Sequence, residues 1–178
     1  LTQRCADGDA ETNLFGARTM FDVVRLVSDA TRDIEKRDAG YLEENNLRFN
    51  ASFIVGGQIA GEPIRLFRTY AEGNFIEASG DTPFFQSGET KYGRPILLRA
   101  YERDMSFADA TKLLLVSFDS TLKANLSVGL PFDLQIIPAD QFRVGYETRI
   151  EVGDAYYNEI SRGWGDALKQ AFKSLPTY

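Results

Sequence analysis

The spacing of apolar residues changes several times along this chain, and the order of those changes restricts the fold more than any other feature. After Thr19, apolar side chains recur every three or four residues, which predicts a helix over about 20–37. Thr19 and Asp22 resemble a capping box at the helix start, and Gly40 supports a stop. From residue 51 onward, the apolar residues gather instead in short runs with turn residues between them.

These short runs predict β-strands joined by tight turns. The four strands that we expect cover 51–59, 64–70, 75–78 and 84–87. Gly, Pro, Asn and Asp occupy the connections, so an antiparallel meander is the simplest arrangement. Gly56 and Gly57 lie inside the first run, where paired glycines mark a bulge or a close backbone approach rather than a phosphate-binding loop.

The second half of the chain predicts two helices, one or two strands and a last helix. The expected segments are helices over 89–102 and 106–124, a strand over 132–137, a strand or ordered loop over 142–152, and a helix over 156–174. Ser106 and Asp154 would cap two of these helices, and Pro95 fits only in the first turns of its helix. The order of elements predicts an α+β fold with separate sheets covered by helices, in a single domain over 1–178.

The composition excludes several classes of function. The 178 residues carry 20 Lys and Arg against 26 Asp and Glu, a net charge of −6, which argues against nucleic acid or an anionic membrane as partner. There is no histidine and one cysteine, so imidazole-based catalysis, His-ligated zinc or haem and an internal disulfide are excluded. We expect no metal and no cofactor, and any chemistry must use hydroxyls, amines, carboxylates or backbone amides.

The cellular setting follows from absent signals. No long apolar run predicts a transmembrane segment, and residues 3–18 form a polar loop rather than a secretion signal. We therefore expect a reduced, cytoplasmic protein.

Local motifs give little on their own. Ser120 and Lys123 match Ser-x-x-Lys, but the companion motifs of that chemistry are absent, so a polar helix face explains them better. Residues 7–11 are acidic but lack the rest of a calcium loop. Thr2 is second rather than first in the chain and precedes polar residues, so it is not expected to act as an N-terminal nucleophile.

Several longer segments, taken together, are more specific. They are SFIVGGQIAGEP at 52–63, QSGETKYGRPIL at 86–97, VSFDST at 116–121, NLSVGLP at 125–131, and Trp164 with Gly165 in the last helix. In this order they resemble the Anbu family of bacterial proteasome-related proteins, which are thought to be close to the ancestral β-subunit. The similarity runs from about residue 20 to the end of the chain.

The resemblance implies the four-layer αββα sandwich of N-terminal-nucleophile hydrolases, of which this chain would form the C-terminal three quarters or so. In such proteins the opening strands carry a catalytic Thr, and a Lys and an oxyanion-hole Gly follow. None of these matches a residue here, so we expect the biological chain to be longer. The resemblance would make the protein a threonine peptidase subunit, with the α-amine as base and backbone amides holding the oxyanion.

Three site positions transfer from the family, and their expected role is to orient the nucleophile by hydrogen bonds. Ser127 matches the Ser that follows the fourth helix. The Asp expected before it falls on Ala124, with Asn125 beside it. An earlier Ser falls around Gly88, between Ser87 and Glu89. Alternatively, Ser127 caps the helix or its turn, and Asn125 simply ends the helix.

Two hypotheses for the function follow. The first is a peptidase that acts on peptides or unfolded proteins. The second is a self-assembling scaffold of proteasome fold with little or no turnover, for which Ala124 is the motivating residue. In both, the resemblance implies identical subunits in an open-ring or helical homo-oligomer in the bacterial cytoplasm, without nucleic acid or membrane.

Overall fold

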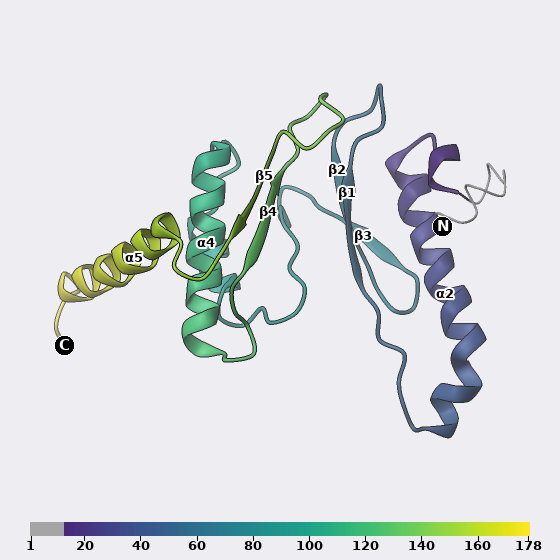
Figure 1. Cartoon of the computed structure of the whole chain (residues 1–178), viewed down its shortest axis with the longest axis horizontal. Helices are drawn as coiled ribbons and strands as arrows, with labels where there is room; N and C mark the ends of the chain where they lie inside the picture. The colour runs from purple at the N-terminus through teal and green to yellow at the C-terminus, as the bar shows by residue number, and fades with distance from the viewer. Residues whose placement is uncertain (1–12) are drawn as a thin grey trace. The chain divides into compact units, whose positions relative to one another are not determined.

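The computed structural model describes residues 13–178 and has a mixed α+β fold (Figure 1). The expectations for Thr2, Cys5, the acidic segment 7–11 and most of the loop 3–18 lie outside these residues. The described chain forms two compact units. The first contains residues 13–87 and Pro138–Phe142, and the second contains Gly88–Ile137 and Arg143–Tyr178. No helix within 13–178 is long and apolar enough to cross a membrane.

The long helix of the first unit begins where the sequence predicts. A short 3-10 helix, η1 (Leu14–Gly16), comes before α2 (Met20–Glu44). Thr19 and Asp22 form the predicted capping box, because the Asp22 amide donates to Thr19 Oγ1 at 3.0 Å and the Thr19 amide donates to Asp22 Oδ2 at 3.1 Å. The predicted stop at Gly40 is wrong. One interior glycine costs a helix only about 1 kcal/mol, and α2 continues to Glu44.

The sheet of the first unit is a three-stranded antiparallel meander. Its strands are β1 (Phe53–Gly57), β2 (Arg65–Thr69) and β3 (Phe75–Glu77), in the order β1-β2-β3. The predicted fourth strand over 84–87 is wrong, because the described chain forms no strand at these residues. An apolar run becomes a strand only when a neighbouring edge accepts its hydrogen bonds.

Glycines allow two close approaches in this unit. Gly56 pairs with Leu66, and a Cβ on Gly56 would lie 3.0 Å from Leu66 Cδ1. The register is continuous, so this position is a close approach and not a bulge. Gly73, with φ +74, turns the chain between β2 and β3, and Arg32 of α2 donates to its carbonyl oxygen at 2.7 Å.

The core of the first unit lies between α2 and one face of its sheet. Met20, Val24 and Phe67 are buried there, and Phe75 packs edge-on against Phe67 with ring centroids 5.9 Å apart. Side chains alternate across a strand, so Ile54 and Ile76, which both pair with Arg68, lie on the opposite face, as does Leu66.

The second unit places helices on a two-stranded sheet. Its elements are α3 (Arg94–Ala100), α4 (Phe107–Ala124), β4 (Phe132–Ile136), β5 (Tyr146–Ile150) and α5 (Ala155–Lys173). The segment 142–152 forms β5, which pairs with β4 in an antiparallel hairpin. The predicted helix over 89–102 is shorter than expected and starts at Arg94, with Pro95 in its first turn. Ser106 and Asp154 cap α4 and α5 as predicted.

The core of this unit is formed by Leu115 of α4, Ile150 of β5 and Tyr157 of α5. Tyr157 donates a hydrogen bond at 3.1 Å to the carboxylate of Asp119, which is also buried. On the other face of the sheet, Arg149 pairs with Asp133 at 2.9 Å. That face is polar and exposed.

Candidate functional site

The candidate site is a hydrogen-bond network at the C-terminal end of α4. Asn125 is the C-cap of this helix, and its backbone amide still donates to the Thr121 carbonyl oxygen at 2.8 Å. Its own φ and ψ of −138° and 111° are extended, so the chain leaves the helix there. The Asn125 side chain then connects two segments that are 36 residues apart, because its Nδ2 donates to Glu89 Oε2 at 3.1 Å.

Asn125 also fixes the hydroxyl of Ser127. Its Oδ1 accepts two hydrogen bonds, from the Ser127 amide at 2.9 Å and from Ser127 Oγ at 2.7 Å. This is the geometry of an Asx turn, in which a side-chain oxygen holds the backbone two residues later. Ser127 as a residue is exposed, while its hydroxyl is held by Asn125.

Glu89 is the charged end of the network. Its Oε1 accepts a hydrogen bond from the Lys91 amide at 2.9 Å. This bond, followed by the one from Asn125, holds the pKa of the Glu89 carboxyl below its ordinary value of 4.5. Gly88 comes directly before it, with φ +80, and turns the chain into this position. The result is an ionised carboxylate that accepts from Asn125 at neutral pH.

A close contact between helices explains why Glu89 reaches Asn125. Gly93, the N-cap of α3, is buried against α4. A Cβ there would lie 2.9 Å from the Ser117 carbonyl oxygen and 3.1 Å from Thr121 Oγ1. Only a residue without a side chain fits this crossing, so the segment before α3 lies directly on the last turns of α4.

The structure therefore brings together two of the three predicted positions and the neighbour of the third. Asn125 and Ser127 are hydrogen bonded, whereas Gly88 contributes a turn and Glu89 supplies the functional group. Ala124 is exposed, and Asn125 carries the polar contacts instead. Ser120 donates to the Val116 carbonyl oxygen at 3.0 Å, as a residue of a polar helix face does.

The chemistry of the network is orientation rather than nucleophilic attack. Ser127 Oγ donates to an amide oxygen, which is not a base and does not activate a hydroxyl. Among residues 13–178 there is no group of three or more acidic or Cys side chains that could hold a metal ion. The network can hold the Ser127 hydroxyl and the Glu89 carboxylate at fixed positions beside a reacting group.

Sequence reasoning did not assign the central role of Glu89 or the part played by Gly93. Glu89 stands next to the matched position, so proximity alone could have identified it. Gly93 gave a weaker signal, as a glycine just before the proline of a helix start.

Comparison with known proteins identifies relatives among solved structures. No protein-family model matches the chain, and no curated protein matches it. An Anbu variant (Gly-1) from Hyphomicrobium sp. strain MC1 is 51% identical over 93% of this chain and 68% of its own, with a TM-score of 0.85. Anbu (ancestral β-subunit) from Yersinia bercovieri is 42% identical over 100% of this chain and 73% of its own, with a TM-score of 0.89.

A third relative was solved as the helical assembly of the Anbu complex from Pseudomonas aeruginosa. It is 43% identical over 90% of this chain and 66% of its own, with a TM-score of 0.83. Identities above 40% along nearly the whole chain, at these TM-scores, reflect common descent with a shared fold. The chain belongs to the Anbu family of proteasome-related proteins.

Proposed function

We propose that the protein is a proteasome-type threonine peptidase subunit that cleaves peptides or unfolded proteins. The nucleophile would be the N-terminal Thr that the family resemblance implies, which matches none of the 178 residues. The observation that carries the proposal is the network of Glu89, Asn125 and Ser127. It includes Ser127 and Asn125 and adjoins Gly88, the positions to which the resemblance transfers the orienting groups.

In this mechanism the Thr hydroxyl attacks the peptide carbonyl carbon, and the α-amine of the same Thr accepts the hydroxyl proton. Ser127 and Asn125 act as positioning residues that hold the amine in the orientation needed for proton transfer. Glu89 keeps the Asn125 amide from rotating, because its carboxylate accepts from Nδ2. This mechanism needs no imidazole, which agrees with a chain that contains no histidine.

The proposal includes the four-layer αββα sandwich, with both units in one proteasome-type domain. In this proposal, each unit supplies one of the two sheets and the helical layer that covers it. The apolar side chains of Ile54 and Ile76, both 42% exposed on the face away from α2, support a further layer on the sheet of the first unit. The protein would act in the bacterial cytoplasm, as one of several identical subunits.

A scaffold subunit with little or no turnover is the second candidate. Ala124, where an orienting Asp is expected, favours it. A peptidase needs the nucleophile held within a narrow geometry, and the loss of one carboxylate weakens that control.

The test uses the full-length protein with its native N-terminus. We expect a peptide electrophile directed at N-terminal Thr to label it, and a Thr→Ala change to abolish labelling. Ser127→Ala and Asn125→Ala are expected to lower kcat for a fluorogenic peptide on the order of 10- to 100-fold, with KM little changed, because they disturb orientation rather than binding.

Ser120→Ala is the matched control, since this Ser lies in α4, which leads into the network, and its hydroxyl is bonded within that helix. It is expected to retain full activity. Labelling that survives the Thr→Ala change would contradict the peptidase proposal. Absence of both labelling and turnover in the parent protein would favour the scaffold.

A further inference from the structure

The hydrogen-bond network at Asn125 has a fixed direction. Turning the side-chain amide by half a turn would exchange its oxygen and its nitrogen. The nitrogen, a donor, would then face the Ser127 backbone N–H, which is also a donor. The oxygen would face the ionised Glu89 carboxylate, which can only accept. Both ends of the network therefore select the same orientation, with Nδ2 toward Glu89 and Oδ1 toward Ser127.

This direction decides what the Ser127 hydroxyl can do. A hydroxyl has one proton, and here that proton is donated to Asn125 Oδ1 at 2.7 Å. Ser127 Oγ keeps only its lone pairs for a further bond. It can accept from an N–H group, and it cannot donate to a carbonyl oxygen or an oxyanion. The network therefore favours an amine or an ammonium group as the neighbour of Ser127.

The far end of the network carries a negative charge. Both oxygens of Glu89 accept a hydrogen bond, Oε1 from the Lys91 amide and Oε2 from Asn125. These donors, with the Lys91 amide first, hold the pKa of the Glu89 carboxyl below its ordinary value. Lys91 is also the charged group that acts on this carboxylate, and α4 faces it with the neutral amide of Asn125. Glu89 thus stays negative throughout the neutral range.

The negative charge at this turn comes from outside α4. Lys123 and Ala124, the last residues of the helix, are both exposed and carry no negative charge. Glu89 belongs to the segment before α3 and reaches Asn125 across 36 positions of the sequence. The absence of an Asp at Ala124 therefore does not leave the turn without a carboxylate.

We propose that Glu89 is a positioning residue that acts, through Asn125 and Ser127, on the protonation of the catalytic amine. The inference rests on the proposed peptidase function, in which the α-amine of the nucleophilic Thr accepts the hydroxyl proton as the oxygen attacks the carbonyl carbon. An N–H of this amine donates to Ser127 Oγ. The nearby negative charge favours the protonated amine, whereas only the neutral amine can accept the proton. Glu89 therefore both orients the amine and sets the pH above which the site is active.

The dependence of kcat/KM on pH tests this role in the full-length protein with its native N-terminus. The acidic limb of the profile reports the titration of the essential base in the free enzyme. Glu89→Gln removes the charge and nearly keeps the shape of the side chain, so the limb should move to lower pH by about 0.5–1 pH unit. We also expect kcat to fall, because Gln offers one oxygen to two donors. A purely structural support would lower kcat and leave the limb in place.

Ala124→Asp is the complementary variant, because it adds a carboxylate directly before Asn125. In the Glu89→Gln background, the acidic limb should move back toward that of the parent. In the parent background, the limb should move to higher pH, because the amine then faces a second negative charge. Ala124 is exposed, so the new side chain needs no repacking. The single variant keeps the test decisive if thermal unfolding shows that Glu89→Gln is poorly folded.

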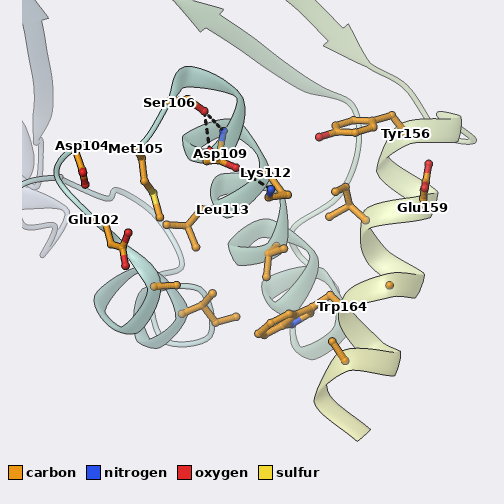
Figure 2. Close-up of a pocket in the computed structure, with 16 residues that line it drawn as sticks. Glu102, Asp104, Met105, Ser106, Asp109, Lys112, Leu113, Tyr156, Glu159 and Trp164 are labelled. Carbon is orange, nitrogen blue, oxygen red and sulfur yellow. Dashed lines mark hydrogen bonds and ion pairs between the residues drawn. The ribbon is translucent and has the colours of Figure 1, made fainter. Parts of the chain in front are cut away.

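Glu102→Gln is the matched control, because it removes the same charge far from the network. Figure 2 shows Glu102 in the loop that leads to Ser106, the N-cap of α4. Asn125 caps the other end of this 18-residue helix, which is about 27 Å long. That length is well beyond the Debye length of about 8 Å at physiological ionic strength. Neither the acidic limb nor kcat should change in this variant.

The outcomes separate this inference from the function on which it rests. Acidic limbs that stay in place in both Glu89→Gln and Ala124→Asp, in a parent with Thr-dependent turnover, would overturn the role of Glu89 and leave the peptidase proposal standing. Absence of turnover in the parent would overturn the peptidase proposal, and the role of Glu89 with it. Limbs that move in opposite directions in the two variants, with no change in Glu102→Gln, are the expected result.

Discussion

The two units of the molecule cover one face of their sheets in the same way and differ on the other face. In the first unit, the face away from α2 carries Ile54 and Ile76, each 42% exposed, with Arg68 paired between them. In the second, the corresponding face carries Asp133 and Arg149, which pair across the strands at 2.9 Å. A sheet with apolar side chains on both faces is suited to burial on both sides, whereas a polar face is suited to water.

The interiors of the units differ as well. The first unit packs Met20, Val24 and Phe67 together, and its buried threonines bond to backbone: Thr31 donates to the Val27 carbonyl oxygen and Thr69 accepts from the Phe53 amide. The second unit buries the hydrogen bond between Tyr157 and Asp119 beside its apolar core. It also contains the network at Asn125. The buried threonine hydroxyls of the first unit thus bond to backbone, whereas the second unit also buries a hydrogen bond between two side chains, which requires defined geometry on both partners.

Phe67→Ala should have the largest effect, because it breaks the first unit at its centre. Phe67 is 1% exposed and packs between α2 and Phe75. Removing a buried phenyl ring is expected to lower the free energy of unfolding by about 3–5 kcal/mol. Urea denaturation measures the loss, and Phe15→Ala, at a residue 87% exposed, is the control that should cost little. A similar cost for both would show that this core is not the main source of stability.

Ile54→Lys and Gln135→Lys compare the free faces of the two sheets directly. If the proposed sandwich covers the face of the first unit, Ile54→Lys places an unpaired charge in a core and costs about 3 kcal/mol in the full-length protein. Gln135→Lys, on the polar face of the second unit, should be close to neutral. Thermal unfolding of both variants sharpens the comparison, and equal, small effects would speak against a layer over Ile54.

Tyr157→Phe tests the polar core of the second unit. The change leaves the buried Asp119 without its donor and is expected to cost about 1–3 kcal/mol. Tyr156→Phe is the matched control, because that neighbouring ring is exposed. Equal stability of the two variants would mean that the hydrogen bond does not contribute.

The same pair predicts a dependence on pH. Burial, and then the negative charge of Asp119, raise the pKa of Tyr157 above its ordinary value of 10. The folded state therefore holds the phenolic proton more tightly than the unfolded state does. This contribution is complete below pH 10 and is lost as the pH rises above it. The stability difference between parent and Tyr157→Phe should shrink there.

Arg149→Ala is expected to have the smallest effect. Arg149 and Asp133 are 54% and 65% exposed, and exposed pairs contribute less than about 1 kcal/mol. Raising the salt concentration should reduce even this difference.

In the first unit, Arg65 holds Glu77 through two short contacts of 2.6 and 2.7 Å, so Arg65→Ala should cost more than Arg149→Ala. The reverse order would contradict this part of the comparison.

Much of the fold could be predicted from local sequence. Thr19, Ser106 and Asp154 lie at the helix starts that they were expected to cap, because an N-cap acts on amides within three residues. The meander was predictable from its turn residues. The limits of α2 and the segment 84–87 were not, since helix ends depend on small local differences and a strand depends on a partner elsewhere in the chain.

The candidate site was predictable only in part. The resemblance identified Ser127 and Asn125, and no local pattern linked them to Glu89. That link depends on Gly93, which allows α3 to lie on α4 and brings together residues separated by 36 positions. Likewise, no periodicity in the sequence reveals that Tyr157 donates to Asp119.

The sequence by itself determined the class of chemistry and the order of elements. The absence of histidine excludes imidazole-based catalysis, and a single cysteine excludes an internal disulfide. Periodic apolar residues specify helices and strands through contacts between near neighbours. The tertiary structure alone decided which polar groups meet and which face of each sheet is covered by helices. Those outcomes depend on contacts between distant segments, whose distances only the folded backbone fixes.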